Sequence, residues 1–162
     1  MTTSIALWAI AKGEMALRTQ NLRDQHEDVS PHVMKLCALF SGISRGTERL
    51  VLNGAVPESE HSRMRCPFQE GIFPFPVKYG YCFVGQVVEG PAERIGQTSF
   101  ALYPHQDLAE IPEDWAIPLP EGLPPRWAVL AANMETALTA VWDSQAGPVS
   151  YTHLTLPTIY SV

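Results

Sequence analysis

The sequence predicts a mostly β protein that ends in one long helix. Fourteen prolines and eleven glycines among 162 residues favour a loop-rich β body over a helix bundle. Residues 77–90, VKYGYCFVGQVVEG, combine aromatic and β-branched residues in the way that is typical of a strand. Residues 126–145, RWAVLAANMETALTAVWDSQ, have the density of Ala, Leu and Met that is expected of a helix.

Alternation of apolar and polar residues predicts the first elements. Residues 4–11 and 14–22 predict a hairpin around Gly13. Residues 33–40 alternate in part, which predicts a strand with one well-buried face. Residues 55–76 contain four prolines and therefore predict a long irregular connection, a kind of segment that often carries function.

Proline marks the boundaries of the later elements. Residues 99–111 predict a further strand and bend, and residues 112–125 predict a proline-rich loop. The pair Pro124–Pro125 precedes the helical stretch and Gly147 follows it, and these are ordinary start and stop signals. The helix is thus expected as the last element of the fold.

Composition excludes several classes of function. The net charge of −6 argues against nucleic acid or an anionic membrane as the main partner. No apolar run approaches the roughly 18 residues of a membrane helix, and the N-terminus lacks the basic region of a signal peptide. Cys37, Cys66 and Cys82 are odd in number and widely spaced, which predicts free thiols in a reducing cytoplasm.

Four stretches, in this order, resemble the medium-chain dehydrogenases and reductases, the zinc-type alcohol dehydrogenase-like family. They are FSGISRGTE, FPFPVKYGYCFVGQVVEG, FALYPHQ and PLPEGLPPRWAVLAANMETALTAVWD, and four motifs in order are more specific than any one of them. The Gly-Ile-Ser-x-Gly-Thr-Glu stretch resembles a branch that includes bacteriochlorophyllide dehydrogenase. The resemblance covers residues 4–148.

The resemblance implies a domain organisation and a class of partner. Residues 1–123 would form a GroES-like, partly open β-barrel, and residues 124–148 would form a helix that leads into a Rossmann domain. In the family, the Rossmann domain binds NAD(P), and a small-molecule substrate lies in the cleft between the two domains. The full-length protein would be a homo-oligomer.

The Rossmann domain itself is missing from the expected fold. A nicotinamide-binding domain needs a G-x-G-x-x-G turn between a strand and a helix, and the sequence contains none. Residues 149–158, VSYTHLTLPT, match the in-frame translation of a transposase-based DNA-sequencing adapter. Residues 149–162 are therefore interpreted as not native, and the chain as a truncated, inactive fragment.

The positions of the catalytic zinc ligands depart from the family pattern. By resemblance, the three ligands would fall at Ser44, Tyr81 and Ala132. A catalytic zinc needs three N, S or O donors and one open position. Serine and tyrosine hydroxyls are poor ligands at neutral pH and alanine is none, so the sequence predicts no catalytic zinc.

Residue type alone suggests a second possible set of metal ligands. His61, Cys66, Cys82 and His105 carry metal-ligating side chains, but their spacing is not diagnostic. The favoured interpretation places His61 and Cys66 in a solvated loop and Cys82 in the core as a small hydrophobe. His105 is a possible general base by type, with a surface-turn histidine as the slightly preferred interpretation.

Two tyrosines are candidates for contact with substrate. If residues 77–83 form a strand, Tyr79 and Tyr81 share one face and Lys78 lies on the other. Tyr81 stands where zinc-using relatives have their histidine, and a phenol can donate a hydrogen bond to a carbonyl. The alternative is that both are ordinary strand tyrosines with buried rings.

The stretch from Ser44 to Glu48 is the second candidate cluster. By resemblance, Arg45 approaches the cofactor pyrophosphate, and an arginine fork suits phosphate; the alternative is a solvated charge in a loop. Thr47 matches a hydroxyl that relays the proton in alcohol dehydrogenases, and it is alternatively the N-cap of a short helix. Ser44 is the other catalytic candidate. Glu48 is placed in the substrate cleft and is expected to be a capping or hydrogen-bonding residue rather than a catalytic acid.

The helix supplies the last candidates. By resemblance, Asn133 and Glu135 lie where the helix meets the cleft, and Thr136 lies on the cofactor side. Glu135 is unusual on an apolar stretch, so it either faces solvent or forms a hydrogen bond.

Two functions follow from these observations. The first is the truncated half of an oxidoreductase that transfers a hydride between NAD(P)H and a carbonyl, an alcohol or an activated alkene. The second is a stand-alone β-barrel that binds a small ligand or a protein without redox activity. A third, less favoured function is that of a metal-dependent alcohol dehydrogenase with rearranged ligands.

Overall fold

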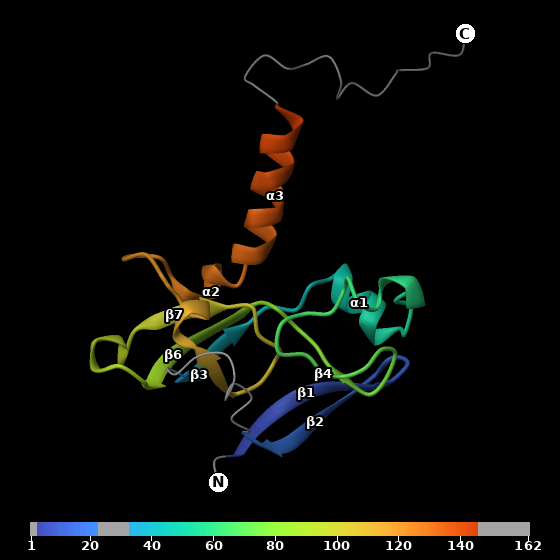
Figure 1. The fold of residues 1–162 in the computed structure, drawn as a ribbon, viewed down its shortest axis with the longest axis horizontal. Helices are drawn as coiled ribbons and strands as arrows, with labels where there is room; N and C mark the ends of the chain where they lie inside the picture. Colours follow the sequence, from blue (N-terminus) through green and yellow to red (C-terminus); the bar gives the residue numbers. More distant parts are fainter. Residues whose placement is uncertain (1–2, 23–32, 146–162) are drawn as a thin grey trace. The chain divides into compact units, whose positions relative to one another are not determined.

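The computed structural model describes residues 3–22 and 33–145. The chain divides into two compact units, Met1–Ala132 and Asn133–Val162. Within the described residues, the first unit holds two antiparallel sheets and two short helices, and the second holds most of one long helix. This is the mostly β fold with one main C-terminal helix that the sequence predicts (Figure 1).

The smaller sheet has four strands in the order β2-β1-β5-β4. Strands β1 (Thr3–Ala11) and β2 (Glu14–Asn21) pair antiparallel, which confirms the predicted hairpin. The turn between them uses Gly13 at φ +76°, a conformation that glycine adopts without a steric penalty. Strand β5 (Val77–Lys78) joins β1 to β4 (Glu70–Gly71), which lies within the predicted irregular connection.

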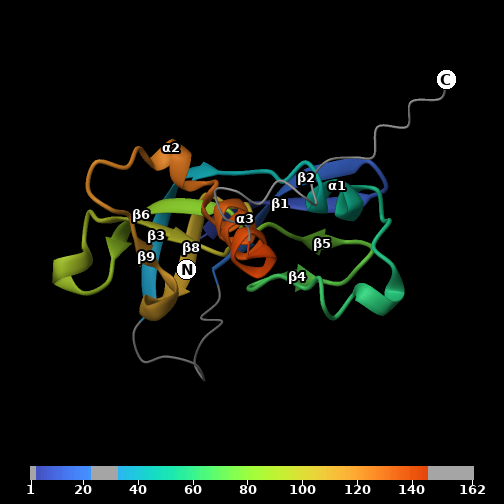
Figure 2. The ribbon, with the colours of Figure 1, turned by 90° about the horizontal axis from the view of Figure 1, so that it is seen from above.

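The larger sheet has five strands in the order β8-β3-β6-β7-β9. These are β3 (Val33–Ser41), β6 (Phe83–Glu89), β7 (Thr98–Ala101), β8 (Leu108–Pro112) and β9 (Ile117–Pro118). Every pairing among them is antiparallel. Figure 2 shows the two sheets side by side, with β3, β6 and β8 in one and β1, β4 and β5 in the other.

Strand β3 has the single buried face that its alternation predicts. Met34 and Leu36 are fully buried and face the core of the larger sheet, whereas Val33, Cys37 and Leu39 are exposed. Burial of a large aliphatic side chain stabilises a fold by about 1.5–3 kcal/mol. The core around this face consists of Met34, Leu36, Phe83, Val87, Ala101, Tyr103, Ala109, Ile111 and Ala116.

Backbone hydrogen bonds join the two sheets at residues 105–107. Ala6 of β1 forms an isolated antiparallel bridge with Gln106. The amide of Leu7 donates to the carbonyl of His105 at 2.9 Å. The segment before β8 is therefore held against β1 almost as a further strand, and it fixes the backbone position of His105.

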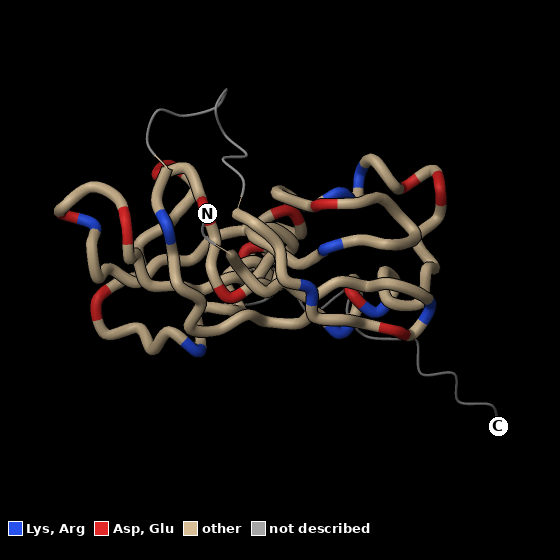
Figure 3. Tube along the Cα trace, turned by 90° about the horizontal axis from the view of Figure 1, so that it is seen from below, with Lys and Arg blue, Asp and Glu red and all other residues tan. Residues whose placement is uncertain are grey.

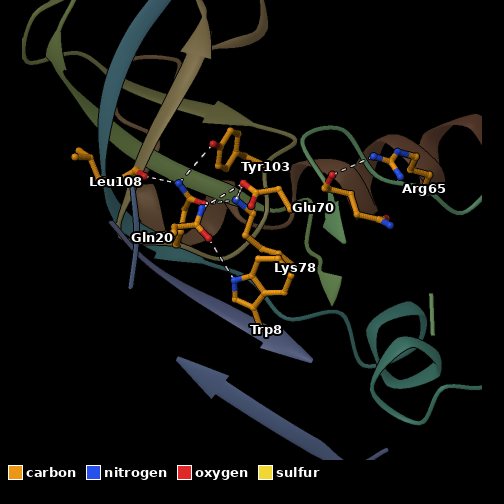
Figure 4. A network of polar contacts seen from close by, with 9 residues as sticks. Trp8, Gln20, Arg65, Glu70, Lys78, Tyr103 and Leu108 are labelled. Atoms are coloured by element: carbon orange, nitrogen blue, oxygen red, sulfur yellow. Dashed lines mark hydrogen bonds and ion pairs between the residues drawn. The ribbon is translucent and has the colours of Figure 1, made fainter. Parts of the chain in front are cut away.

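A buried lysine anchors the smaller sheet (Figure 4). Lys78 is fully buried, and its ammonium donates to Glu70 at 2.5 Å and to Gln106 at 2.8 Å. Gln20 donates to the same Glu70 carboxylate at 3.2 Å and accepts from the indole of Trp8 at 3.3 Å. Burial lowers the pKa of Lys78, and the hydrogen bond and charge of Glu70 act against that shift. Buried charges need such partners.

The predicted single helix over residues 126–145 is wrong in one respect, because it is broken. Helix α2 (Pro125–Ala128) has Val129 as its C-cap, and α3 (Ala131–Ser144) begins two residues after that cap. The amide of Leu130 bonds to the carbonyl of Trp127 at 3.0 Å, a tighter turn than that of an α-helix. Ala128 packs into a core cluster with Val84 and Phe100, and Val129 packs against that cluster, which fixes the direction of α2.

The remaining helices are short. Helix α1 is Thr47–Leu52, and the 3-10 turns are Glu58–Glu60, Ala92–Arg94 and Glu113–Trp115. In the part of the chain that the structure describes, no helix is long and apolar enough to cross a membrane. Basic positions are scattered among acidic ones along the trace (Figure 3).

Candidate functional site

The candidate site lies where the end of β3 meets the start of β6. The amide of Gly42, directly after β3, donates to the carbonyl of Cys82, directly before β6, at 2.8 Å. A Cβ on Gly42 would lie 3.1 Å from the Cβ of Val129 and 3.3 Å from that of Cys82. The residues that follow Gly42 lead into α1, so this junction carries the predicted cluster from Ser44 to Glu48.

Three side chains form a hydrogen-bonded chain at this junction. The imidazole of His105 contacts the Glu48 carboxylate through Nε2 at 2.7 Å and the Ser41 hydroxyl through Nδ1 at 2.5 Å. His105 is 5% exposed and Glu48 is 8% exposed, whereas Ser41 is exposed. The interpretation of His105 as a surface-turn histidine is therefore wrong, because its side chain is almost fully buried.

Glycine at position 80 makes room for this imidazole. Gly80 has φ +140°, and a Cβ there would lie 2.9 Å from both Cδ2 and Nε2 of His105. Real Cβ atoms essentially never come so close to other heavy atoms. The ring of His105 thus occupies space that a side chain at position 80 would need.

The carboxylate of Glu48 is held at both oxygens. Oε2 contacts His105, and Oε1 accepts a hydrogen bond from the backbone amide of Ser44 at 2.9 Å. This agrees with the expected hydrogen-bonding role of Glu48. The alternative role of Thr47 as N-cap is wrong, because the N-cap of α1 is Gly46 and no side chain caps the helix.

The two candidate tyrosines lie in a break between strands, not in a continuous strand over 77–83. Strand β5 ends at Lys78 and β6 begins at Phe83. Tyr79 and Tyr81 still lie together, with ring centroids 6.3 Å apart in an edge-to-face arrangement.

The two rings differ in their surroundings. Tyr79 is buried, and its hydroxyl donates to the carbonyl of Met64 at 2.9 Å. Burial raises the pKa of Tyr79 above its ordinary value, so the phenol stays protonated. Tyr81 is half-buried. The structure thus gives Tyr79 a structural partner and leaves Tyr81 the more accessible of the two.

A small cavity lies beneath this site. It is lined by Glu48 and Tyr79 together with apolar side chains of β1, β2, α1 and β5. Its space of about 10 Å³ admits at most a single water molecule. This cavity is therefore too small to hold a substrate.

The cysteines of the second metal set pack as core residues. Cys66 and Cys82 are buried, so the interpretation of Cys66 as part of a solvated loop is wrong, and that of Cys82 as a small core residue is confirmed. Burial raises the pKa of each thiol from 9.0 to about 11. His61 is half-buried with its ring 5.3 Å from that of Phe73.

Metal-ligating side chains do not gather in the described residues. Within residues 3–22 and 33–145, no group of three His, Cys, Asp or Glu side chains could hold a metal ion. At the positions of the family's zinc ligands, Ser44 and Tyr81 offer only hydroxyls and Ala132 offers a methyl group. This donor set does not fit a catalytic zinc.

The expected cofactor-side residues are exposed. Arg45 lies in the loop before α1 with its side chain in solvent. Asn133, Glu135 and Thr136 are exposed on α3, and Glu135 accepts a hydrogen bond from Thr139 of the same helix at 3.3 Å. The structure therefore brings Ser44 and Glu48 together near His105, while Asn133, Glu135 and Thr136 belong to the second unit.

Sequence reasoning missed Ser41 and undervalued His105. Ser41 is the last residue of β3 and His105 lies 64 positions away, so no local spacing joins them. A usable signal was present in FALYPHQ, where His105 follows an apolar strand whose neighbours are buried.

Solved structures share the fold of this chain. A quinone oxidoreductase from Thermus thermophilus, studied also in complex with NADPH, is 23% identical with a TM-score of 0.57, covering 89% of this chain and 42% of its own. A short chain alcohol dehydrogenase from E. coli in complex with NADH is 13% identical with a TM-score of 0.64, over 90% and 47%. A mutant enoyl thioester reductase from Candida tropicalis is 16% identical with a TM-score of 0.51, over 82% and 36%.

These likenesses establish the fold. The chain spans less than half the length of these structures. No family model matches the sequence, and no curated protein matches it. The fold class predicted from the sequence, mostly β with one main C-terminal helix, is confirmed.

Proposed function

We propose that the chain is the substrate-side portion of a nicotinamide-dependent oxidoreductase of the medium-chain dehydrogenase/reductase type. The observation that carries this proposal is the shared fold with structures described as oxidoreductases, over less than half of their length. Two of these structures are described with NADPH or NADH. A stand-alone binding module is not favoured by these likenesses.

The proposed reaction transfers a hydride between NAD(P)H and a carbonyl, an alcohol or an activated alkene. Hydride transfer is the chemistry of the cofactor, and the protein orients the substrate and handles a proton. Half-buried hydroxyls at Ser44, Thr47 and Tyr81 are groups that can donate to a substrate oxygen. The remaining assignments are Arg45 and Thr136 toward the cofactor, and Tyr79, Glu48, Asn133 and Glu135 toward the substrate.

The reaction is proposed to proceed without a catalytic zinc. Support comes from the donor set, since Ser44, Tyr81 and Ala132 offer no thiolate or imidazole at the family's ligand positions. The Gly-Ile-Ser-x-Gly-Thr-Glu stretch further suggests the branch that includes bacteriochlorophyllide dehydrogenase. The cysteines in the described residues are free thiols, which supports a cytoplasmic setting. Assembly as a homo-oligomer rests on the resemblance alone.

Cofactor binding tests the proposal. The 162-residue chain is titrated with NADPH while nicotinamide fluorescence is followed, beside the longer protein encoded by the reading frame that continues beyond Pro148 in the source genome. We expect saturable binding by the longer protein only. Saturable micromolar binding by the shorter chain, or its absence in the longer protein, would contradict the proposal. One tightly bound zinc per longer chain would overturn the zinc-free assignment.

A further inference from the structure

The hydrogen-bonded chain at the site runs from a buried carboxylate to an exposed hydroxyl. Glu48 and His105 are 8% and 5% exposed, and Ser41 at the other end is exposed. The two contacts of the imidazole measure 2.7 Å to Glu48 and 2.5 Å to Ser41.

The partners of Glu48 determine the direction of each hydrogen bond. An ionised carboxylate only accepts, and it accepts from the Ser44 amide at Oε1 and from His105 Nε2 at Oε2. The neutral imidazole then carries its proton on Nε2 and presents the lone pair of Nδ1 to Ser41. The hydroxyl of Ser41 therefore donates to His105 and keeps its oxygen lone pairs for a ligand.

Glu48 is the carboxylate that contacts this imidazole, with its Oε2 atom 2.7 Å from Nε2 of His105. The charge of Glu48 also acts on the thiols of Cys66 and Cys82 and on the phenol of Tyr79. Burial raises the pKa of all three groups, so they remain neutral.

We propose that Ser41, His105 and Glu48 form a proton relay, and that the Ser41 hydroxyl exchanges a proton with the oxygen of a carbonyl or alcohol substrate. This inference rests on the proposed function. In alcohol oxidation, the substrate oxygen gives its proton to Ser41 Oγ, and Ser41 gives its own proton to His105 Nδ1. A nicotinamide bound to the longer protein would accept the hydride from the substrate carbon, and the oxygen lone pair would form the C=O bond. The imidazolium returns the proton to water through Ser41.

The roles within the relay are unequal. Ser41 is the catalytic residue because it touches the substrate oxygen. His105 and Glu48 act through Ser41, and Gly80 acts by leaving space for the ring, since its absent Cβ would lie 2.9 Å from the imidazole. The amide of Leu7 donates a hydrogen bond to the carbonyl of His105 at 2.9 Å, which holds the backbone of His105 in place.

A thiol in place of the serine hydroxyl tests the relay in the 162-residue chain. In Ser41→Cys, a proton relay would convert the new thiol to a thiolate beside His105, and thiolates are the species that iodoacetamide alkylates. Cys37 is an exposed thiol on the same strand and is the internal comparator. Cys66 and Cys82 are buried with pKa values of about 11 and should stay unmodified.

The measurement is the alkylation rate of each cysteine near neutral pH, followed by peptide mass spectrometry. We expect the thiol introduced by Ser41→Cys to react at least about tenfold faster than Cys37. Adding His105→Gln should bring the two rates together, and circular dichroism checks that this variant folds. If it does not fold, the rate ratio in Ser41→Cys alone decides. Equal rates in Ser41→Cys would overturn the relay.

The same experiment separates this inference from the proposed function. The alkylation needs no nicotinamide, so equal rates would remove the relay and leave the oxidoreductase assignment standing. A longer protein that fails to bind NADPH would remove that assignment, while a fast, His105-dependent alkylation would still show proton transfer at position 41.

Discussion

Gly80→Ala is the most direct perturbation of the site that leaves its functional side chains unchanged. The new Cβ would lie 2.9 Å from the His105 ring and 3.1 Å from the His105 backbone nitrogen. An L-residue at φ +140° costs about 1–3 kcal/mol in backbone strain, and overpacking costs about 1–3 kcal/mol more. We expect a loss of about 3–4 kcal/mol in the free energy of unfolding. For a chain of this size, that loss lowers Tm by about 10 °C.

Gly96→Ala is the matched control. Gly96 has φ +81° and no heavy atom within 4 Å of an added Cβ, so this variant carries backbone strain without a clash. Thermal unfolding followed by circular dichroism gives both Tm values. The excess loss in Gly80→Ala over Gly96→Ala combines the contact with His105 and the difference in backbone strain between φ +140° and φ +81°.

A double-mutant cycle assigns the excess to the imidazole. In a His105→Ala background, the ring atoms near position 80 are gone, and Gly80→Ala should cost about 1 kcal/mol less than in the parent chain. Equal losses in Gly80→Ala and Gly96→Ala would refute the argument that Gly80 makes room for His105. A cost of Gly80→Ala that is unchanged by His105→Ala would assign the clash to the backbone instead.

Two further predictions concern buried ionisable groups. Glu70→Gln leaves the ammonium of the fully buried Lys78 without its carboxylate partner and should destabilise the chain by about 3 kcal/mol in urea unfolding. Glu60→Gln, in a surface pair with Arg63, should change stability by less than about 0.5 kcal/mol, and similar losses would contradict the prediction. The pKa of Cys66 is raised from 9.0 to about 11, so between these values the unfolded chain binds fewer protons and stability falls as pH rises. Cys66→Ala lacks this effect, and the stability advantage of the parent chain over Cys66→Ala should shrink by roughly 2 kcal/mol between about pH 8 and pH 11. A constant difference would show that the thiol is not protected from ionisation.

Local patterns were sufficient for most of the fold. The Gly13 hairpin and the one-sided burial of Met34 and Leu36 follow from alternation over a few residues, because a strand repeats every second residue. The break between α2 and α3 did not follow, since it depends on how Ala128 and Val129 pack against Val84 and Phe100, which lie far away in sequence.

The candidate site was only partly predictable for the same reason. Glu48 was expected to form hydrogen bonds because its chemistry requires partners, and it does so. His105 lies 57 positions from Glu48 and 64 positions from Ser41 along the chain, so only the tertiary fold brings the three together. Tyr79 is a cleft candidate by alternation; in the structure, strand β5 ends at Lys78, and the hydroxyl of Tyr79 donates to the carbonyl of Met64.

The backbone bridge between β1 and residues 105–107 ties the lifetime of the site to that of the hairpin. Leu7 holds the carbonyl of His105, and Ile5 and Asp107 form a reciprocal pair of bonds, with the Asp107 amide at 3.0 Å from the Ile5 carbonyl and the Ile5 amide at 2.7 Å from the Asp107 carboxylate. Segments of a folded protein open locally with their own free energies. Whenever β1 detaches, His105 loses its anchor, so the Ser41–His105–Glu48 geometry can be no more persistent than the attachment of the first strand.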